Sequence, residues 1–209
     1  MPIGKDRLGR ELRRYQLAMR LMIHEARTQT ICDWTGLTRE RLKTLRHEWS
    51  IPSEARHRGP SPTSLSVFFR SPRARGESSA LAVLCRILGA IPSARMAHAA
   101  RRLPSLDAGE QLCDAFEAYQ VYFPRSGIEF EQAVLLVLAL AQGDALALQH
   151  CTNCDGLFLI DRFAAMRRIC SHCQRMASVR ADRAEPRHGE IAFDGDGDDE
   201  SASPQQVLF

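Results

Sequence analysis

Apolar residues recur at helical spacing near the start of the chain. From Leu12 to Cys32 they fall mostly three or four positions apart, with arginines between them, which predicts an amphipathic helix. Thr35-Gly36 interrupts the pattern, and Thr38 is typical of the N-cap of a second helix that runs to about Trp49. Residues 1–50 are therefore expected to form an N-terminal helical unit in which a tight turn joins two helices.

Residues 51–79 differ from this unit in composition. The segment contains four prolines and many serines and arginines, which argue against a long helix and indicate an extended linker or arm. Its one apolar island, Leu65 to Phe69, would anchor the arm to a core through Val67-Phe68-Phe69.

Helical patterning resumes across residues 80–149, which we expect to form a helical body. The expected helices are Ser79 to Leu88, a segment around Met96 to Arg102, Leu106 to Tyr122, and Ile128 to Gln149. Residues 135–140 are apolar on every face, as expected of a helix at the centre of a bundle or in a subunit interface.

The pattern changes after His150. Residues 150–185 combine closely spaced cysteines with basic residues, and Leu157 to Ile160 is a strand-like apolar run. Residues 186–209 are poor in apolar residues and rich in Asp and Gly, which predicts a disordered acidic tail. The expected fold class is mainly α, with a helical body, a C-terminal four-cysteine zinc-ribbon-like module and this tail.

Composition narrows the class of protein. The 209 residues are 44% hydrophobic and 25% charged, which is ordinary for a globular chain. The longest apolar run, residues 133–141, is about half the length of a membrane-spanning helix. The first ten residues are polar and lack the hydrophobic segment of a secretory signal. A cytoplasmic protein with no membrane partner is expected.

The net charge of +3 combines two unlike regions. Six of the 25 acidic residues lie after Arg187, so residues 1–188 carry 28 basic and 19 acidic residues, a net charge of +9. All but two of the basic residues are arginines, which bind phosphate and carboxylate groups well. Arginine content also rises with genome base composition, so its excess alone indicates nucleic-acid binding only weakly.

Four of the seven cysteines form a motif. Cys151-x2-Cys154 and Cys170-x2-Cys173 are separated by fifteen residues, a spacing typical of structural zinc sites. Each pair presents two thiolates to a tetrahedral Zn²⁺, and Gly156 supplies a permissive backbone beside the first pair. We expect one structural zinc ion per chain, bound by all four cysteines. Four protein ligands leave no open position for catalysis, so no enzymatic activity is expected.

The cysteines have other interpretations. The spacing could be coincidental, or a pair could be a redox dithiol, although a thioredoxin-like dithiol begins a helix in a βαβ setting and neither pair is expected there. His172 could replace one cysteine as a ligand, or it could face solvent or contact phosphate. Cys32, Cys85 and Cys113 lie on apolar helix faces and are expected to be buried core residues.

Basic residues surround the cysteine motif, and such density is expected of a surface that contacts DNA or RNA. The candidates are Arg162, Arg167, Arg168, Arg175, Arg180 and Arg183, with Arg187 beyond them. The alternatives are a solvated positive face and an intramolecular partner for the acidic tail.

The N-terminal unit carries a second candidate for DNA binding. Its small, glycine and apolar positions match a helix-turn-helix: Ile31, Cys32, Gly36, Leu37, Leu42 and Leu45. The second helix would then expose Arg39, Glu40, Lys43 and Arg46, of which Arg39 and Lys43 join the DNA-binding candidates. An ordinary αα-hairpin with a glycine turn gives much of the same pattern.

Four segments together resemble one known family. They are Tyr15 to Leu21, Ala26-Arg27-x-Gln29, Leu37-Thr38-Arg39-x-Arg41-Leu42 and the four-cysteine motif. Over residues 8–185 the chain resembles the FlhC family, a subunit of the flagellar master transcriptional regulator. It departs from that family between Arg56 and Arg75 and in the tail after Pro186.

The resemblance implies an all-helical body with a zinc-stabilised C-terminal region, in which Cys151, Cys154, Cys170 and Cys173 bind the metal. It implies a hetero-oligomer with FlhD-like subunits, a heterohexamer in the family, that binds double-stranded DNA upstream of promoters and recruits RNA polymerase. The predicted function is a DNA-binding transcriptional activator of flagellar operons or of further operons. Two other functions stay open, a zinc-ribbon protein–protein interaction module without direct DNA contact, and a metalloenzyme or thiol oxidoreductase.

Overall fold

The computed structural model describes residues 3–51, 60–91, 103–165 and 167–184, with the backbone alone for 3–6 and 180–184. These ranges are mainly α-helical and contain one small antiparallel sheet. The elements are α1 (Ile3–Ile23), α2 (Thr28–Thr35), α3 (Arg39–Glu48), the 3-10 helix η2 (Leu65–Phe69), α4 (Pro72–Ile87), α5 (Leu106–Tyr122), α6 (Phe130–Gln142), β1 (Leu146–His150), β2 (Leu157–Asp161) and α7 (Ser171–Ala184).

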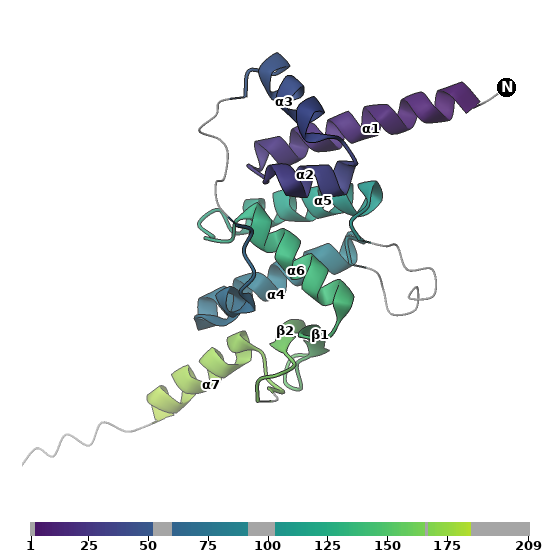
Figure 1. Cartoon of the computed structure of the whole chain (residues 1–209). Helices are drawn as coiled ribbons and strands as arrows, with labels where there is room; N and C mark the ends of the chain where they lie inside the picture. Colours follow the sequence, from purple (N-terminus) through teal and green to yellow (C-terminus); the bar gives the residue numbers. More distant parts are fainter. Residues whose placement is uncertain (1–2, 52–59, 92–102, 166, 185–209) are drawn as a thin grey trace, which may run out of the picture.

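The molecule is elongated. α1, α2 and α3 lie at one end, α4, α5 and α6 fill the middle, and the β1–β2 hairpin with α7 lies at the other end (Figure 1). No helix in the described ranges is long and apolar enough to cross a membrane.

The N-terminal unit contains one more helix than expected. The helix predicted from Leu12 to Cys32 is wrong as a single element, because the backbone leaves α1 after Ile23 and Glu25 adopts a left-handed conformation with φ of 57°. The predicted turn is confirmed, since Gly36 ends α2 with φ of 70° and the Thr38 side chain accepts a hydrogen bond from the N–H of Arg41.

Ion pairs align α1 with α5. Each of two α1 arginines bridges two α5 carboxylates at 2.6 to 2.8 Å, Arg13 with Asp107 and Glu110, and Arg20 with Asp114 and Glu117. Beneath them the helices approach closely at Gly109, where an added Cβ would lie 2.7 Å from a methyl carbon of Leu17. The buried Leu17 and Leu112 join these helices in the main core.

The apolar island of the arm packs as expected, but the arm is shorter. Phe68 in η2 is fully buried, which confirms the anchoring role. α4 then begins at Pro72, seven residues before the expected start at Ser79. The cause is local, because the Ser71 hydroxyl accepts a hydrogen bond from the N–H of Ala74 and proline suits the first turn of a helix. Residues 52–59 lie outside the described ranges.

The middle helices follow the sequence pattern more closely. α5 has the predicted bounds, and the segment around Met96 to Arg102 lies outside the described residues. The helix predicted to extend to Gln149 instead stops at Gln142, because Gly143 turns the chain with φ of 75°. Residues 146–150 form β1, a strand that the sequence analysis did not predict.

The hairpin is attached to the helical body through α4. β1 and β2 pair in register from Leu146 opposite Asp161 to His150 opposite Leu157. Leu159 is buried in the main core, and its N–H donates to the Ser79 hydroxyl of α4 at 3.0 Å. α7 also contacts α4. The cysteine-bearing segment therefore packs against the helical body on α4. Residues 185–209, including the predicted tail, lie outside the described part.

Replacing the anchor of the arm should destabilise the protein. Phe68→Ala removes a fully buried ring, so we expect the free energy of unfolding to fall by about 3–5 kcal/mol. Phe163→Ala is the matched control, because Phe163 is 82% exposed and its loss should cost under about 0.5 kcal/mol. Urea denaturation measures both, and equal effects would contradict the anchoring role.

The α1–α5 ion pairs predict a pH dependence. Partial burial raises the pKa of Glu117, but hydrogen bonds from Arg20 and His24 outweigh it and hold that pKa below its ordinary value. The resulting stability is therefore complete above the ordinary glutamate pKa and is lost as the pH falls through the lowered value.

Glu117→Gln tests this dependence. Because Glu117 is nearly half exposed, the variant should lose only about 0.5 kcal/mol at pH 7 and show a smaller deficit at pH 3. Asp144→Asn, in the exposed α6–β1 turn, should leave the wild-type profile unchanged. An equal deficit for Glu117→Gln at both pH values, measured by thermal unfolding, would contradict the ion-pair explanation.

Candidate metal centre

The first cysteine pair lies at the tip of the hairpin. Cys151 directly follows β1, and its N–H donates to the carbonyl of Gly156 at 3.0 Å. Asp155 closes the turn with φ of 57° and donates its N–H to the carbonyl of Cys151. The expected permissive backbone at Gly156 is not needed, because the left-handed residue of this turn is Asp155, and a Cβ at Gly156 would lie 3.4 Å from the Cys154 Sγ.

The second pair lies at the start of a helix. Cys170 directly precedes α7, Cys173 lies in its first turn, and the N–H of Cys173 donates to the Cys170 Sγ at 3.5 Å. This pair therefore shares one feature of a thioredoxin-like dithiol, its place at the start of a helix. The neighbouring sheet is a two-stranded antiparallel hairpin, so the βαβ setting of a thioredoxin-like dithiol is missing from the described residues.

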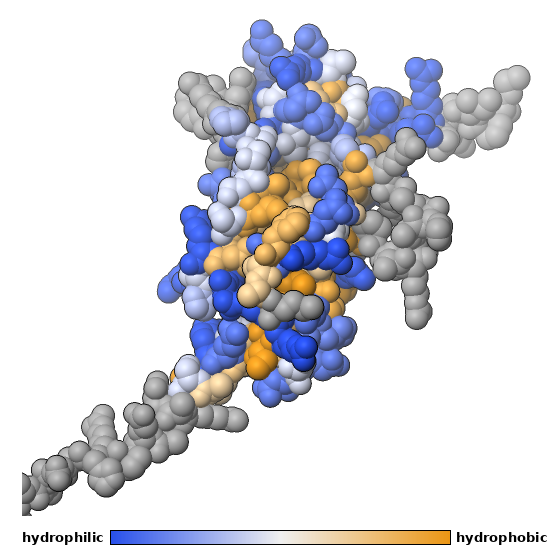
Figure 2. All heavy atoms as spheres, turned by 60° about the horizontal axis from the view of Figure 1, so that its bottom comes forward, coloured by the Kyte–Doolittle hydropathy of each residue, from blue (hydrophilic) through white to orange (hydrophobic). Residues whose placement is uncertain are grey.

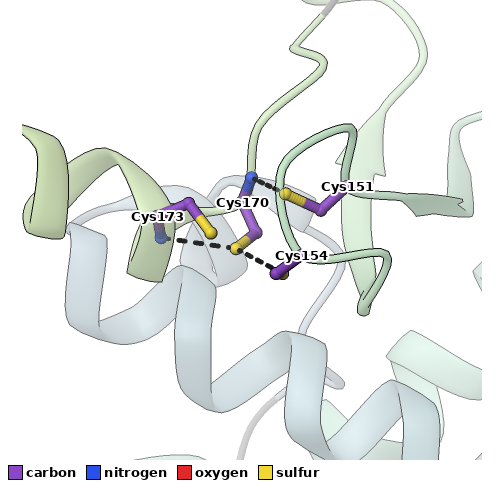
Figure 3. A group of neighbouring side chains, drawn as sticks. All are labelled: Cys151, Cys154, Cys170 and Cys173. Atoms are coloured by element: carbon purple, nitrogen blue, oxygen red, sulfur yellow. Dashed lines mark hydrogen bonds between the residues drawn. The ribbon is translucent and has the colours of Figure 1, made fainter.

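All four thiols converge on one small volume. Their sulfur atoms lie within 4.8 Å of one another, and those of Cys154 and Cys170 are 3.9 Å apart. Figure 3 shows the two pairs approaching from the hairpin and from α7. Four thiolates at tetrahedral positions around zinc, with bonds of about 2.3 Å, lie about 3.8 Å apart. The cluster therefore has dimensions that fit a four-coordinate metal ion.

The electrostatics of the cluster also favour a cation. The N–H of Cys170 donates to the Cys151 Sγ at 3.3 Å and lowers the pKa of that thiol to about 6. The N–H of Gly156 lowers the pKa of Cys154, but the neighbouring cysteine side chains outweigh it and raise that pKa to about 12. Ionisation of one thiol therefore disfavours ionisation of the next, and the positive charge of a bound divalent cation would offset this repulsion between thiolates.

The other histidine and cysteine candidates lie apart from the cluster. His172 is exposed and lines, together with Cys170, a hollow of about 430 Å³, and it is not among the four converging residues. Cys85 and Cys113 are fully buried, and burial raises the pKa of each thiol to about 12. Cys32 is half-buried against the core. Burial in the core is confirmed for Cys85 and Cys113, while Cys32 packs against the core from a partly exposed position.

Four of the predicted arginines are exposed: Arg162, Arg167, Arg168 and Arg175. Arg162 lies at the open end of the hairpin, where its N–H donates to the carbonyl of Ala145, and the other three lie within three residues of the second cysteine pair in the sequence. The Arg168 carbonyl accepts hydrogen bonds from the N–H and the hydroxyl of Thr152, which tie the loop before α7 to the first cysteine turn. The Arg167 side chain donates to Gln174 at 3.2 Å. Arg180 and Arg183 lie in α7, and their side chains are outside the described part.

The second set of basic candidates, on α3, lies away from the cysteine cluster. Arg39 is exposed and donates to Gln29, and Lys43 is exposed on α3. Arg46, expected on the exposed face, is buried and donates to the Thr28 hydroxyl at 2.9 Å. Figure 1 places α3 at the opposite end of the molecule from the hairpin and α7, which carry the cysteine pairs, so the two basic sets are not brought together within one chain.

The sequence analysis missed one basic residue near the cluster. Arg75 was assigned to the linker, but it lies on α4 and lines a cavity together with Arg162 and Arg167. Ser71 followed by Pro72, a combination typical of a helix start, was the signal that could have placed it.

No family model matches this chain, and no curated protein matches it either. Fold and site together define a mainly helical protein with a four-cysteine cluster that could hold a metal ion. The resemblance to the FlhC family stays a prediction.

Removal of one thiol tests the metal centre. Purified wild-type protein should contain about one zinc ion per chain, and Cys154→Ser should contain less than half of that because the tetrahedral ligand set is incomplete. Cys32→Ser, which changes a thiol far from the cluster, should retain the wild-type zinc content. Metal content measured by plasma mass spectrometry decides this, and equal zinc in both variants would contradict the ligand assignment.

Proposed function

We propose that this chain is a zinc-containing, DNA-binding transcriptional activator that works in a hetero-oligomer with FlhD-like subunits and recruits RNA polymerase. The observation that carries the proposal is the union of a rigid four-thiol cluster with an exposed arginine surface. Between Arg162 and Arg180 the sequence has five arginines and one histidine, and it has no Asp or Glu. Such a surface attracts the phosphates of DNA.

Zinc is proposed as the metal because four thiolates at tetrahedral dimensions are its preferred structural ligand set. The ion would hold the hairpin against the first turn of α7. With all four positions filled by sulfur it would bind no water for catalysis, and a structural role for the metal is therefore part of the proposal.

Phosphate contacts at this surface would supply affinity, and base contacts would have to supply sequence preference. α3, with exposed Arg39 and Lys43, is the second proposed DNA-contacting element. Since the two surfaces lie at opposite ends of the chain, contacts from several subunits of an oligomer would have to add up to useful affinity (Figure 1).

An exposed apolar stripe on α1 supports the proposed partner. Leucine, methionine and isoleucine side chains recur there at helical spacing and are 40 to 73% exposed: Leu8, Leu12, Met19 and Ile23. Aligned apolar residues on a solvent-facing helix are typical of sites that pack against another helix. We propose this stripe as the docking site for an FlhD-like subunit.

A protein–protein interaction module without direct DNA contact is the second candidate function. It is favoured by exposed apolar side chains close to the arginines, with Phe163 82% exposed and Ile169, Met176 and Val179 each at least 40% exposed. A surface that contacts only phosphates has no need of them.

Binding to DNA at several salt concentrations separates the two functions. The protein, co-expressed with the FlhD-like subunit of the same genome, should bind a duplex of roughly four helical turns. Because phosphate contacts release counterions, its affinity should fall steeply between about 50 and 200 mM salt. Fluorescence anisotropy measures both, and no binding, or binding independent of salt, would contradict the activator proposal.

Replacing Arg167 and Arg168 with alanine tests the surface itself. The double variant should weaken DNA binding about tenfold and reduce the salt slope by about two, without changing the mass of the oligomer in light scattering. Arg125→Ala, an exposed arginine in the α5–α6 connection, is the control and should bind as the wild type does. An unchanged double variant would favour the interaction module.

A further inference from the structure

A cleft of about 580 Å³ lies where the loop before α7 faces α4 and η2. Its walls come from five parts of the chain, namely η2, α4, β1, β2 and the described residues of the connection from β2 to α7. Clefts of about 300–1,000 Å³ that combine apolar walls with a few polar groups are typical small-molecule sites. The dimensions of this cleft therefore fit a small organic ligand.

The floor of the cleft is apolar. Phe158 and Ile160 are alternate residues of β2, so they lie on the same face of the hairpin, and Phe69 and Ile169 line the cleft beside them. Phe158 also packs against the buried Cys151 and Cys173. The cysteine cluster thus packs against one residue of the cleft floor. Figure 2 shows hydrophobic residues gathered between hydrophilic ones on the face that is turned forward.

Three guanidinium groups line the same cleft. Arg75 donates its Nε to the Phe69 carbonyl at 3.2 Å, and Arg167 donates one terminal nitrogen to Gln174. The described residues give Arg162 no side-chain partner. Asp161 is the one acidic residue among the described lining residues, and its Oδ1 accepts a hydrogen bond from the N–H of Phe163. The lining therefore carries an excess of positive charge over an apolar floor.

From this geometry we propose that the cleft binds a small organic anion with an apolar body, such as an aliphatic carboxylate. The arginines would hold the carboxylate, because a planar guanidinium donates two parallel hydrogen bonds to two oxygens of an anion. The apolar chain would cover Ile160, which is half-buried, and Ile169, which is 40% exposed, and remove their surface from water. The cleft shares Arg162 and Arg167 with the proposed DNA-contacting surface, but its ligand binds without nucleic acid.

Decanoate is a suitable probe because it joins one carboxylate to an apolar chain. Isothermal titration of the zinc-loaded, full-length protein with decanoate, below its micelle concentration, should give saturable binding at one site per chain. Decanol has the same chain without the charge, and it should bind at least about tenfold more weakly because it forms no ion pair with the arginines.

Three variants locate the site. Arg162→Gln should weaken decanoate binding about fivefold or more, because it removes one guanidinium from the cleft. Ala165→Trp adds an indole to an exposed position of the lining and should abolish binding by filling the space. Arg86→Gln changes an exposed arginine of α4 outside the lining and should leave the affinity unchanged.

The outcomes are distinguishable. A variant counts as folded when its thermal unfolding temperature equals that of the wild type, and decanoate affinities are compared only among folded variants. Saturable decanoate binding that is lost in Ala165→Trp and retained in Arg86→Gln supports the proposal. No saturable binding, equal affinity for decanol, or full binding by folded Ala165→Trp would overturn it. None of these outcomes depends on whether the protein binds DNA.

Discussion

Four sulfur atoms from two separate turns share a volume less than 5 Å across, and this convergence governs the C-terminal part of the molecule. A two-stranded hairpin has little stability alone, and α7 is a single helix at the end of the body. The cluster links the tip of the hairpin to the first turn of that helix (Figure 3). Arg168, whose carbonyl accepts two hydrogen bonds from Thr152, lies in the loop that this link holds.

α4 carries that arrangement into the helical body. It contacts α5, α6, both strands and α7, and its Ser79 hydroxyl receives a backbone hydrogen bond from β2. A buried carboxylate fixes α4 in turn, because Glu77 accepts hydrogen bonds from Arg73 and from Ser126, and Ser126 also bonds the buried Tyr119. The elements that carry the cysteine cluster therefore pack on α4, and hydrogen bonds between polar groups inside the core fix the position of α4.

The sequence predicted those features that depend on local spacing. The bounds of α5, the turn at Gly36 and the convergence of four cysteines all follow from periodicity, glycine and ligand spacing. Three features were not predicted, because a local break overrides the apolar pattern or because the residue packs against a segment distant in the sequence. Glu25 breaks an otherwise helical pattern, Gly143 ends α6 so that the apolar residues beyond it form β1, and Arg46 is buried by packing against α2. The cleft could not be predicted, since its walls come from segments about 90 residues apart.

X-ray absorption spectroscopy at the zinc edge of the purified protein tests the central claim most directly. Four converging thiols predict a single shell of four sulfur atoms at about 2.3 Å from the metal. A shell that includes nitrogen or oxygen ligands, or protein that binds no zinc when refolded in its presence, would contradict the claim that these four cysteines form one structural metal centre.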